Sequence, residues 1–316
     1  MSLPERLGRL ERVERLGAGG FATVWLYRDT ELESDVAVKA LADNWAQRLD
    51  VRERFLEEAR ILRRADSDHI VRVYDVGEVD ATPYFVMTYA DRGTVAGLAE
   101  DGRQLPLDQV VDLVAQAGAG LSVLHDLGIV HRDVKPQNLL LRGSRDGTRV
   151  LVADLGVAKA MLHASGLTQV VGSPAYMAPE QVRGTGIDRR ADVHALAAVA
   201  YQLLTGRLAR STTLSDLLGA SLPVPPSSVA DVSPAVDAVL LRGLQPDPRD
   251  RWPDIASFVA ALRSAAEGPP PAPTLINDPP PAARPTGALT PAFTLLLLLV
   301  LGAAFAAAYA VTAAAR

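Results

Sequence analysis

Short apolar runs separated by polar turns fill the first 90 residues. TVWLY, DVAVKAL, IVRVYDVGEV and PYFVMTY are rich in β-branched and aromatic residues, a composition typical of strands. One stretch among them, residues 51–64, has helical spacing instead, with Phe55, Ala59 and Leu62 on one face. The pattern predicts a small sheet with one helix over residues 10–90.

The pattern becomes mostly helical after Asp91. Apolar residues recur at helical spacing in four segments, 107–127, 192–204, 233–244 and 255–266, and a strand-and-loop region at 129–157 interrupts them. No internal repeat is visible. The sequence therefore predicts an α+β protein with two unequal lobes, at 10–90 and 91–264, joined near residues 88–91.

The C-terminal part has a different character. Nine prolines occur in the 24 residues 268–291, which favours an extended linker over a packed core, and we assign 265–291 to it. Residues 292–315 carry no charge, and as a helix they would be about 36 Å long, enough for a ~30 Å hydrocarbon core. We predict a transmembrane helix over 292–315; the alternative is a buried C-terminal helix.

The N-terminus shows no export signal. Its first 17 residues carry frequent charges and no apolar run, so they are not a secretory signal peptide. We expect a single-pass protein of the cell membrane, in contact with lipid through its C-terminal helix and with its folded domain in the cytoplasm.

Composition excludes several classes of function. The 316-residue chain contains no cysteine, which excludes disulfides, thiolate metal sites and cysteine nucleophiles. Its net charge of −5, without a run rich in Lys or Arg, argues against a nucleic-acid binder. Arginine supplies 29 of its 32 basic residues, and the only lysines are Lys39, Lys135 and Lys159. Asparagine is equally scarce, with Asn44, Asn138 and Asn277, so either residue type in a motif is noteworthy.

A glycine-rich segment lies between the first two strand-like runs. Residues 16–24 read LGAGGFATV, and such a bare backbone can close over phosphate groups; the alternative is a tight hairpin. A strand rather than a helix follows it, unlike a dinucleotide-binding fingerprint. No Gly-Lys-Ser/Thr ends it, unlike a P-loop.

Lys39 lies in the middle of the apolar run VAVKAL. A lysine buried in such a strand needs a counter-charge; the alternative is a lysine that reaches out to solvent from the strand end. The following helix offers Glu57 and Glu58. Glu58 lies three residues after Phe55 and four before Leu62, near the buried edge of the helix, so we predict that Glu58 is the partner.

Two further segments concentrate polar chemistry. HRDVKPQN places Asp133, Lys135 and Asn138 in one loop, and VLVADLG delivers Asp154 at the end of an apolar run. A carboxylate and an amide oxygen can together hold Mg²⁺, which prefers oxygen ligands.

In this order, GAGGFATV, VAVK, HRDVKPQN, DLG and APE resemble the motifs of bacterial, eukaryotic-like (Hanks-type) serine/threonine protein kinases, over residues 10–264. The resemblance implies the two-lobed kinase fold and the cofactors ATP and Mg²⁺. It also implies that ATP phosphate is transferred to Ser and Thr hydroxyls of proteins, autophosphorylation included, in bacterial signalling.

The same resemblance assigns roles to residues. Lys39, held by Glu58, would bind the α- and β-phosphates, and Asp133 would accept the substrate's hydroxyl proton. Lys135 would neutralise charge on the γ-phosphoryl group, while Asn138 and Asp154 would coordinate Mg²⁺. The remaining ATP-binding positions are Leu16, Gly17, Ala18, Gly19, Gly20, Phe21, Ala22, Thr23, Val24, Ala37, Met87, Thr88, Ala90 and Leu140.

The segment 154–180 resembles an activation segment, and Ser165 and Thr168 are its candidate phosphosites. Phosphate there could pair with Arg132, because phosphorylation adds negative charge; the alternative is an unmodified loop. Glu180 and Arg251 match the family's buried ion pair, and Asp192 matches its anchor for the catalytic loop.

Some positions depart from the family. Ala22 replaces a loop glycine, Leu155 replaces the usual Phe, and Thr88 stands where Glu is frequent. Ala197 replaces a frequent glycine, and the string TGRLAR lacks the usual Pro-Phe. No catalytic group is lost. A membrane-anchored pseudokinase acting as a scaffold and a small-molecule phosphotransferase are the competing functions, and a homodimer is compatible with the sequence.

Overall fold

The computed structural model describes residues 3–145, 147–156, 174–210 and 222–268, with 292, 295–296, 298–304 and 306 near the C-terminus. The chain divides into two units, Met1–Pro269 and Pro270–Arg316. Ser165, Thr168, Lys159 and most of the predicted linker lie outside the described residues.

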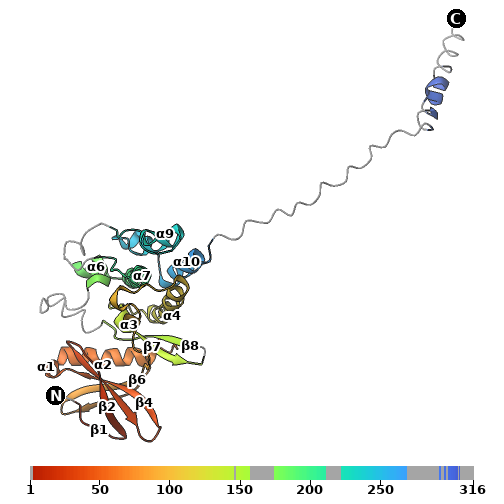
Figure 1. Ribbon diagram of the computed structural model, residues 1–316. Helices are drawn as coiled ribbons and strands as arrows, with labels where there is room; N and C mark the ends of the chain where they lie inside the picture. The colour runs from red at the N-terminus through yellow and green to blue at the C-terminus, as the bar shows by residue number, and fades with distance from the viewer. Residues whose placement is uncertain are drawn as a thin grey trace. The chain divides into compact units, whose positions relative to one another are not determined.

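The N-terminal lobe is built on a six-stranded antiparallel sheet with the order β1-β2-β3-β4-β6-β5 (Figure 1). A long helix, α2 (Leu49–Arg64), packs against it after a single turn, α1 (Asp43–Ala46). The strands are β1 (Arg6–Leu7), β2 (Leu10–Ala18), β3 (Ala22–Asp29), β4 (Ser34–Leu41), β5 (Val73–Val79) and β6 (Thr82–Thr88).

Alternation along β4 decides which residues reach helix α2. Successive side chains of a strand point to opposite faces of the sheet. Val36 and Val38 accordingly join a small cluster on the outer face of the sheet, whereas Ala37 and Leu41 join the main core with the apolar residues of α2. Lys39 shares the parity of Ala37 and Leu41, so its ammonium group faces α2.

Helices form the larger, C-terminal lobe (Figure 1). Its centre is α7 (Arg190–Thr205), where all but two of the 16 residues are buried; a helix that is buried all round needs small apolar side chains, and α7 contains five alanines. Helices α4 (Leu107–Asp126), α9 (Pro234–Gly243) and α10 (Ile255–Glu267) pack against it. The lobe also contains the short helices α3 (Val95–Leu98) and α6 (Pro179–Arg183).

A two-stranded hairpin, β7 (Leu139–Ser144) and β8 (Gly147–Val152), connects the lobes. The Val152 N–H donates to the His69 carbonyl at 2.9 Å, and the Val71 N–H donates to the Val152 carbonyl at 3.0 Å. Helix α4 approaches this junction so closely that a Cβ at Gly120 would lie 2.4 Å from the His69 carbonyl oxygen. Only glycine permits that approach, which fixes the hairpin against both lobes.

The structure confirms the predicted α+β architecture and the five helices predicted between residues 51 and 266, whose ends differ from the prediction by no more than two residues. The short helices α1, α3 and α6 were not predicted, since four or five residues are too few to show a period.

Helical backbone is also described at 292, 295–296, 298–304 and 306, where the leucines and Val300 are exposed. Among the described residues, α4 alone has the length and apolar composition of a membrane span, and half of that stretch is buried inside the C-terminal lobe.

Candidate active site

Lys39 makes the contact that joins the two lobes. Its Nζ donates to Glu58 Oε1 at 2.8 Å and to Asp154 Oδ1 at 2.7 Å. Lys39 and Glu58 are buried at 7% and 3% exposure, whereas the side chain of Asp154 is 44% exposed. The predicted partnership of Lys39 and Glu58 is confirmed, and a carboxylate from the other lobe shares the same ammonium group.

The charge of Lys39 is secured by these carboxylates. Burial lowers the pKa of Lys39, but the charges of Asp154 and Glu58 and their hydrogen bonds outweigh it, so the pKa is raised above its usual value. Lys39 therefore stays cationic at neutral pH, which the predicted phosphate-binding role requires.

The glycine-rich loop forms the turn between β2 and β3. At its tip three successive carbonyl groups accept hydrogen bonds: Gly20 O from the Trp45 indole at 2.8 Å, Phe21 O from the Ala42 N–H at 2.8 Å, and Ala22 O from the Gly19 N–H at 2.8 Å. The predicted residues 16–20 are exposed and residues 21–24 are half-buried. Sequence reasoning missed Trp45, which lies in no motif.

The catalytic-loop residues predicted from HRDVKPQN lie together. Asn138 Nδ2 donates to Asp133 Oδ2 and to the Asp133 carbonyl, each at 2.8 Å, and lies 3.5 Å from the Asp154 carbonyl. Lys135 Nζ lies 3.2 Å from Asp133 Oδ2. With Lys39 and Glu58, these four residues form one continuous set of contacts, here called the interlobe cluster: Lys39, Glu58, Asp133, Lys135, Asn138 and Asp154.

A buried carboxylate of α7 holds the catalytic loop from behind. Asp192 accepts from the His131 N–H at 2.8 Å, from the Arg132 N–H at 2.9 Å and from the His125 ring at 2.8 Å. Arg132 has a positive φ of 66°, a conformation that costs energy unless its surroundings impose it. The Asp192 bonds impose it, so the predicted anchoring role of Asp192 is supported directly.

Asp154 is positioned in a comparable way. It also has a positive φ, 56°, and the Gly156 N–H donates to the His131 carbonyl at 2.9 Å. A Cβ at Gly156 would lie 2.9 Å from that oxygen, so the glycine after the aspartate is required for close contact with the catalytic loop.

The donor set at Asn138 and Asp154 suits a hard cation. Asn138 uses its amide N–H group within the cluster. Its amide oxygen is the atom that could coordinate a metal. Among the described residues there is no group of three His, Cys, Asp or Glu side chains able to hold a metal by themselves. One carboxylate and one amide oxygen fit Mg²⁺, which keeps several waters and binds substrate phosphates.

The predicted adenine contacts lie near the junction of the lobes. Ala37 and Met87 are paired across β4 and β6 and are buried, and Leu140 on β7 is half-buried. Thr88 is also buried, but its N–H donates to the Arg72 carbonyl at 2.9 Å and its hydroxyl lies 3.2 Å from the Tyr74 hydroxyl. The N–H and side chain of Thr88 are thus used within the lobe, while Ala90 follows β6 and is half-buried.

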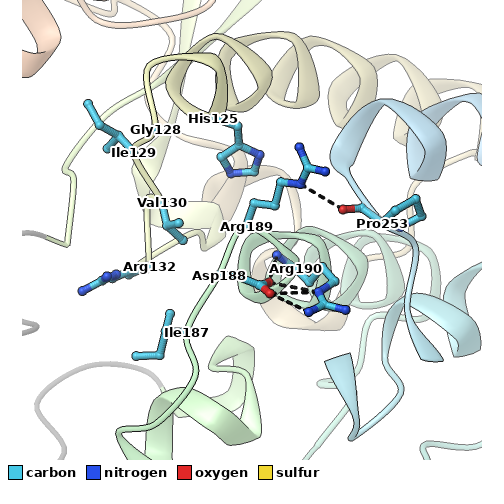
Figure 2. Close-up of a pocket in the computed structure, with 10 residues that line it drawn as sticks. All are labelled: His125, Gly128, Ile129, Val130, Arg132, Ile187, Asp188, Arg189, Arg190 and Pro253. Carbon is cyan, nitrogen blue, oxygen red and sulfur yellow. Dashed lines mark hydrogen bonds and ion pairs between the residues drawn. The ribbon is translucent and has the colours of Figure 1, made fainter. Parts of the chain in front are cut away.

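Figure 2 shows a pocket of about 590 Å³ behind the catalytic loop. Arg190 pairs with Asp188 at 2.6 Å, and its hydrogen bonds hold the pKa of that carboxyl below its usual value. Arg189 donates to the Pro253 carbonyl at 3.1 Å. Arg132, on the other side of the pocket, is exposed, and its guanidinium pairs with no residue in the described part of the chain.

Glu180 and Arg251 form the predicted buried pair, with bonds of 2.7 and 2.8 Å. Arg251 also donates to the carbonyl groups of Gln245, Arg190 and Pro246. A guanidinium has five N–H donors, so this arginine is fully satisfied.

A β-rich lobe with a glycine-rich turn, a helical lobe, and a lysine shared between carboxylates of both lobes define the protein kinases as a class. The chain belongs to this family, because the protein kinase domain model matches residues 10–253.

Similar proteins include two bacterial serine/threonine-protein kinases. PknB of Mycobacterium leprae is 35% identical over 298 residues, covering 88% of this chain and 46% of PknB. Pkn1 of Myxococcus xanthus is 38% identical over 269 residues, covering 82% of this chain and 38% of Pkn1. The chain thus spans less than half the length of these relatives.

The fold is similar to that of the Mycobacterium tuberculosis PknI kinase domain. That crystal structure has a TM-score of 0.68 and 28% identity, with 84% of this chain and 100% of the other covered. The two-lobed kinase fold predicted from the motifs is confirmed.

Proposed function

We propose that the chain is an ATP- and Mg²⁺-dependent protein serine/threonine kinase, with residues 10–264 as its catalytic domain. The observation that carries this proposal is the interlobe cluster, in which Lys39 and Asp154 meet at 2.7 Å across the two lobes. Each side chain of that cluster has a use in phosphoryl transfer, and the protein's task there is mainly positioning and electrostatic stabilisation.

ATP would lie beneath the glycine-rich loop, with Lys39 on its α- and β-phosphates. Asn138 and Asp154 would hold Mg²⁺, which supplies charge neutralisation on the phosphates. The buried Ala37 and Met87, together with Val24 and Leu140, suit an adenine ring, with backbone groups of residues 88–90 as its polar partners.

Asp133 would accept the proton of the substrate hydroxyl. The Asn138 amide group donates to one oxygen of this carboxylate at 2.8 Å and holds it in place. Lys135 Nζ lies 3.2 Å from the same oxygen, and it would neutralise charge on the γ-phosphoryl group during transfer. The lysine two residues after the aspartate is similar to Ser/Thr kinases, so we propose Ser and Thr hydroxyls of proteins as substrates, the chain's own included.

The decisive experiment uses the full chain with labelled ATP, Mg²⁺ and a generic protein substrate, beside Asp133→Asn. General-base catalysis contributes about 10²–10⁴-fold, so Asp133→Asn should lower kcat by that factor with its thermal midpoint retained. Transfer by the wild type no faster than by this variant would refute the kinase activity and leave a scaffold that binds nucleotide.

Regulation through phosphorylation of Thr168 or Ser165 is part of the proposal. Arg132 lies next to the catalytic Asp133 and bonds to Asp192 through its backbone, so a phosphate on its guanidinium would act close to the catalytic loop. Mass spectrometry of active protein should find one of the two residues phosphorylated, and Arg132→Ala should remove the activation; finding neither residue modified contradicts it.

We also propose that residues 292–315 anchor the protein in the cell membrane, with the kinase domain in the cytoplasm. Exposed leucines on the described helical residues support this, because an uncovered apolar surface is unfavourable in water. The full chain should sediment with membranes and resist carbonate extraction, while a chain ending at 268 should not. Equal release of both forms would contradict an anchor.

A further inference from the structure

The tip of the glycine-rich loop presents N–H groups and conceals carbonyl groups. Gly20, Phe21 and Ala22 each have their carbonyl oxygen bonded within the lobe. The N–H groups of Gly20 and Phe21 donate to nothing in the described part of the chain. From Gly20 to Ala22 the backbone offers N–H donors while its carbonyl oxygens are occupied, an arrangement suited to an anion.

One of these three bonds depends on a side chain. The Gly20 oxygen is held at 2.8 Å by the indole N–H of Trp45, and the Trp45 ring also packs on Phe21, with ring centroids 5.1 Å apart and an interplanar angle of 32°. The C=O and N–H of a trans peptide point in opposite directions. Holding the Gly20 oxygen on Trp45 therefore turns the Phe21 N–H to the other side of the loop.

Trp45 is in turn attached to helix α2. It belongs to α1, which ends at Ala46, only three residues before α2 begins. The Arg48 guanidinium lies 5.9 Å from the Trp45 ring centroid and bonds to Asp50 in the first turn of α2. The helix that carries Glu58 is thus connected to the loop tip through a few residues.

We propose that Trp45 is a positioning residue for binding of the terminal phosphates of ATP: it holds the loop tip with its N–H groups turned toward them and ties that state to helix α2. This inference rests on the proposed function, since it takes ATP phosphate as the ligand. It predicts that the contribution of Trp45 grows with the number of phosphates bound.

The test compares Trp45→Phe and Trp45→Ala with the wild-type full chain by calorimetry, using the non-hydrolysable analogue AMP-PNP with Mg²⁺, ADP with Mg²⁺, and adenosine. Trp45→Phe keeps an aromatic ring but loses the donor, so affinity for AMP-PNP should fall about 3–10-fold. Trp45→Ala loses the ring contact as well, so its affinity for AMP-PNP should fall further, by about tenfold or more. Adenosine affinity should remain unchanged in both.

Trp252→Phe is the matched control, because the Trp252 indole donates to the Val239 carbonyl at 3.1 Å within the C-terminal lobe. It should bind all three ligands as the wild type does. Unchanged AMP-PNP affinity in both Trp45 variants would overturn the inference, as would an equal loss for adenosine and AMP-PNP, which would mean a purely structural role.

The outcomes also separate this inference from the kinase proposal. A wild type that binds AMP-PNP but transfers no phosphate defeats the kinase activity and leaves the Trp45 inference to be decided by the affinities. A wild type that binds no nucleotide overturns both.

Discussion

Two buried ion pairs, one in each lobe, have nearly the same geometry and opposite designs. Lys39 and Glu58 are 2.8 Å apart, and Arg251 and Glu180 are 2.7 and 2.8 Å apart. Arg251 uses all five of its N–H donors inside the C-terminal lobe. Lys39 instead shares its charge with the half-exposed Asp154 of the other lobe.

The difference shows why the chain uses arginine for one pair and lysine for the other. A guanidinium fixes several acceptors in a rigid plane, whereas an ammonium group on a flexible stem can exchange one partner for another. In a chain with 29 arginines among its 32 basic residues, Lys39 is found where the proposed ATP phosphates would have to be accommodated. We call Glu180–Arg251 the closed pair and Lys39–Glu58 the open pair. The closed pair stabilises the C-terminal lobe, and the open pair is available for the proposed reaction.

Removing the closed pair should have the largest effect on folding. Arg251→Met leaves Glu180 buried without a counter-charge, so the free energy of unfolding should fall by about 3–5 kcal/mol. Urea denaturation followed by circular dichroism measures it. A decrease in the free energy of unfolding below about 1 kcal/mol would show that the pair does not stabilise the fold.

Arg251→Lys is the graded control for that measurement. It keeps the positive charge but offers three donors in place of five. Its free energy of unfolding should therefore fall by an intermediate amount, about 2 kcal/mol. The kcat of the folded fraction should stay at the wild-type level in both Arg251 variants.

The reciprocal exchange, Lys39→Arg, should separate catalysis from stability. The charge beside Glu58 is kept, but the broad guanidinium cannot take the same place on the phosphates. We expect kcat to fall about 10²–10³-fold, while the urea midpoint falls less than in Arg251→Met. Wild-type kcat in this variant would erase the distinction between the two pairs.

Acidification should produce the smallest effect on stability, through His194, whose pKa is lowered in part by Arg251 of the closed pair. His194 is fully buried on α7, and burial, followed by the charges of Arg251 and Arg210, holds its pKa well below 6.5, although a Tyr176 backbone group partly opposes this. Below pH 6.5 the unfolded chain takes up a proton that the folded chain refuses, so stability is lost as pH falls.

The loss from His194 should be about 1.4 kcal/mol for each pH unit below 6.5. Urea unfolding of the wild type and His194→Phe at pH 7.5 and 5.5 measures it as the difference between their pH dependences. Equal dependences would mean that His194 takes up a proton as readily in the folded protein as in the unfolded chain, which contradicts a lowered pKa.

Motifs and periodicity predicted the parts of the site whose chemistry is local. The position of Glu58 on its helix, three residues from Phe55, identified the partner of Lys39 before the fold was known. Asp192 and the Glu180–Arg251 pair were likewise predictable, because they accompany the motifs in order along the chain.

Contacts made by unremarkable residues were not predictable. Trp45 lies in a single-turn helix without a period, and its contact with Gly20 depends on how β4 ends and how the loop folds back. The hydrogen bonds of Thr88 depend on the approach of β5, which no local pattern encodes. Such contacts arise from tertiary packing between segments that no sequence pattern relates to each other.

The placement of the lysines has a practical consequence for chemistry on this protein. Lys39 is 7% exposed and the side chain of Lys135 is 13% exposed, and the whole chain has only one lysine more. A nucleotide that carries an amine-acylating group would therefore meet two lysines at the place where its phosphates are expected, and Lys39 would react only through the small fraction that loses its proton, because its pKa is raised. Peptide mapping of the acylated lysine would then report which phosphate position each amine reaches, with almost no background from the remainder of the chain.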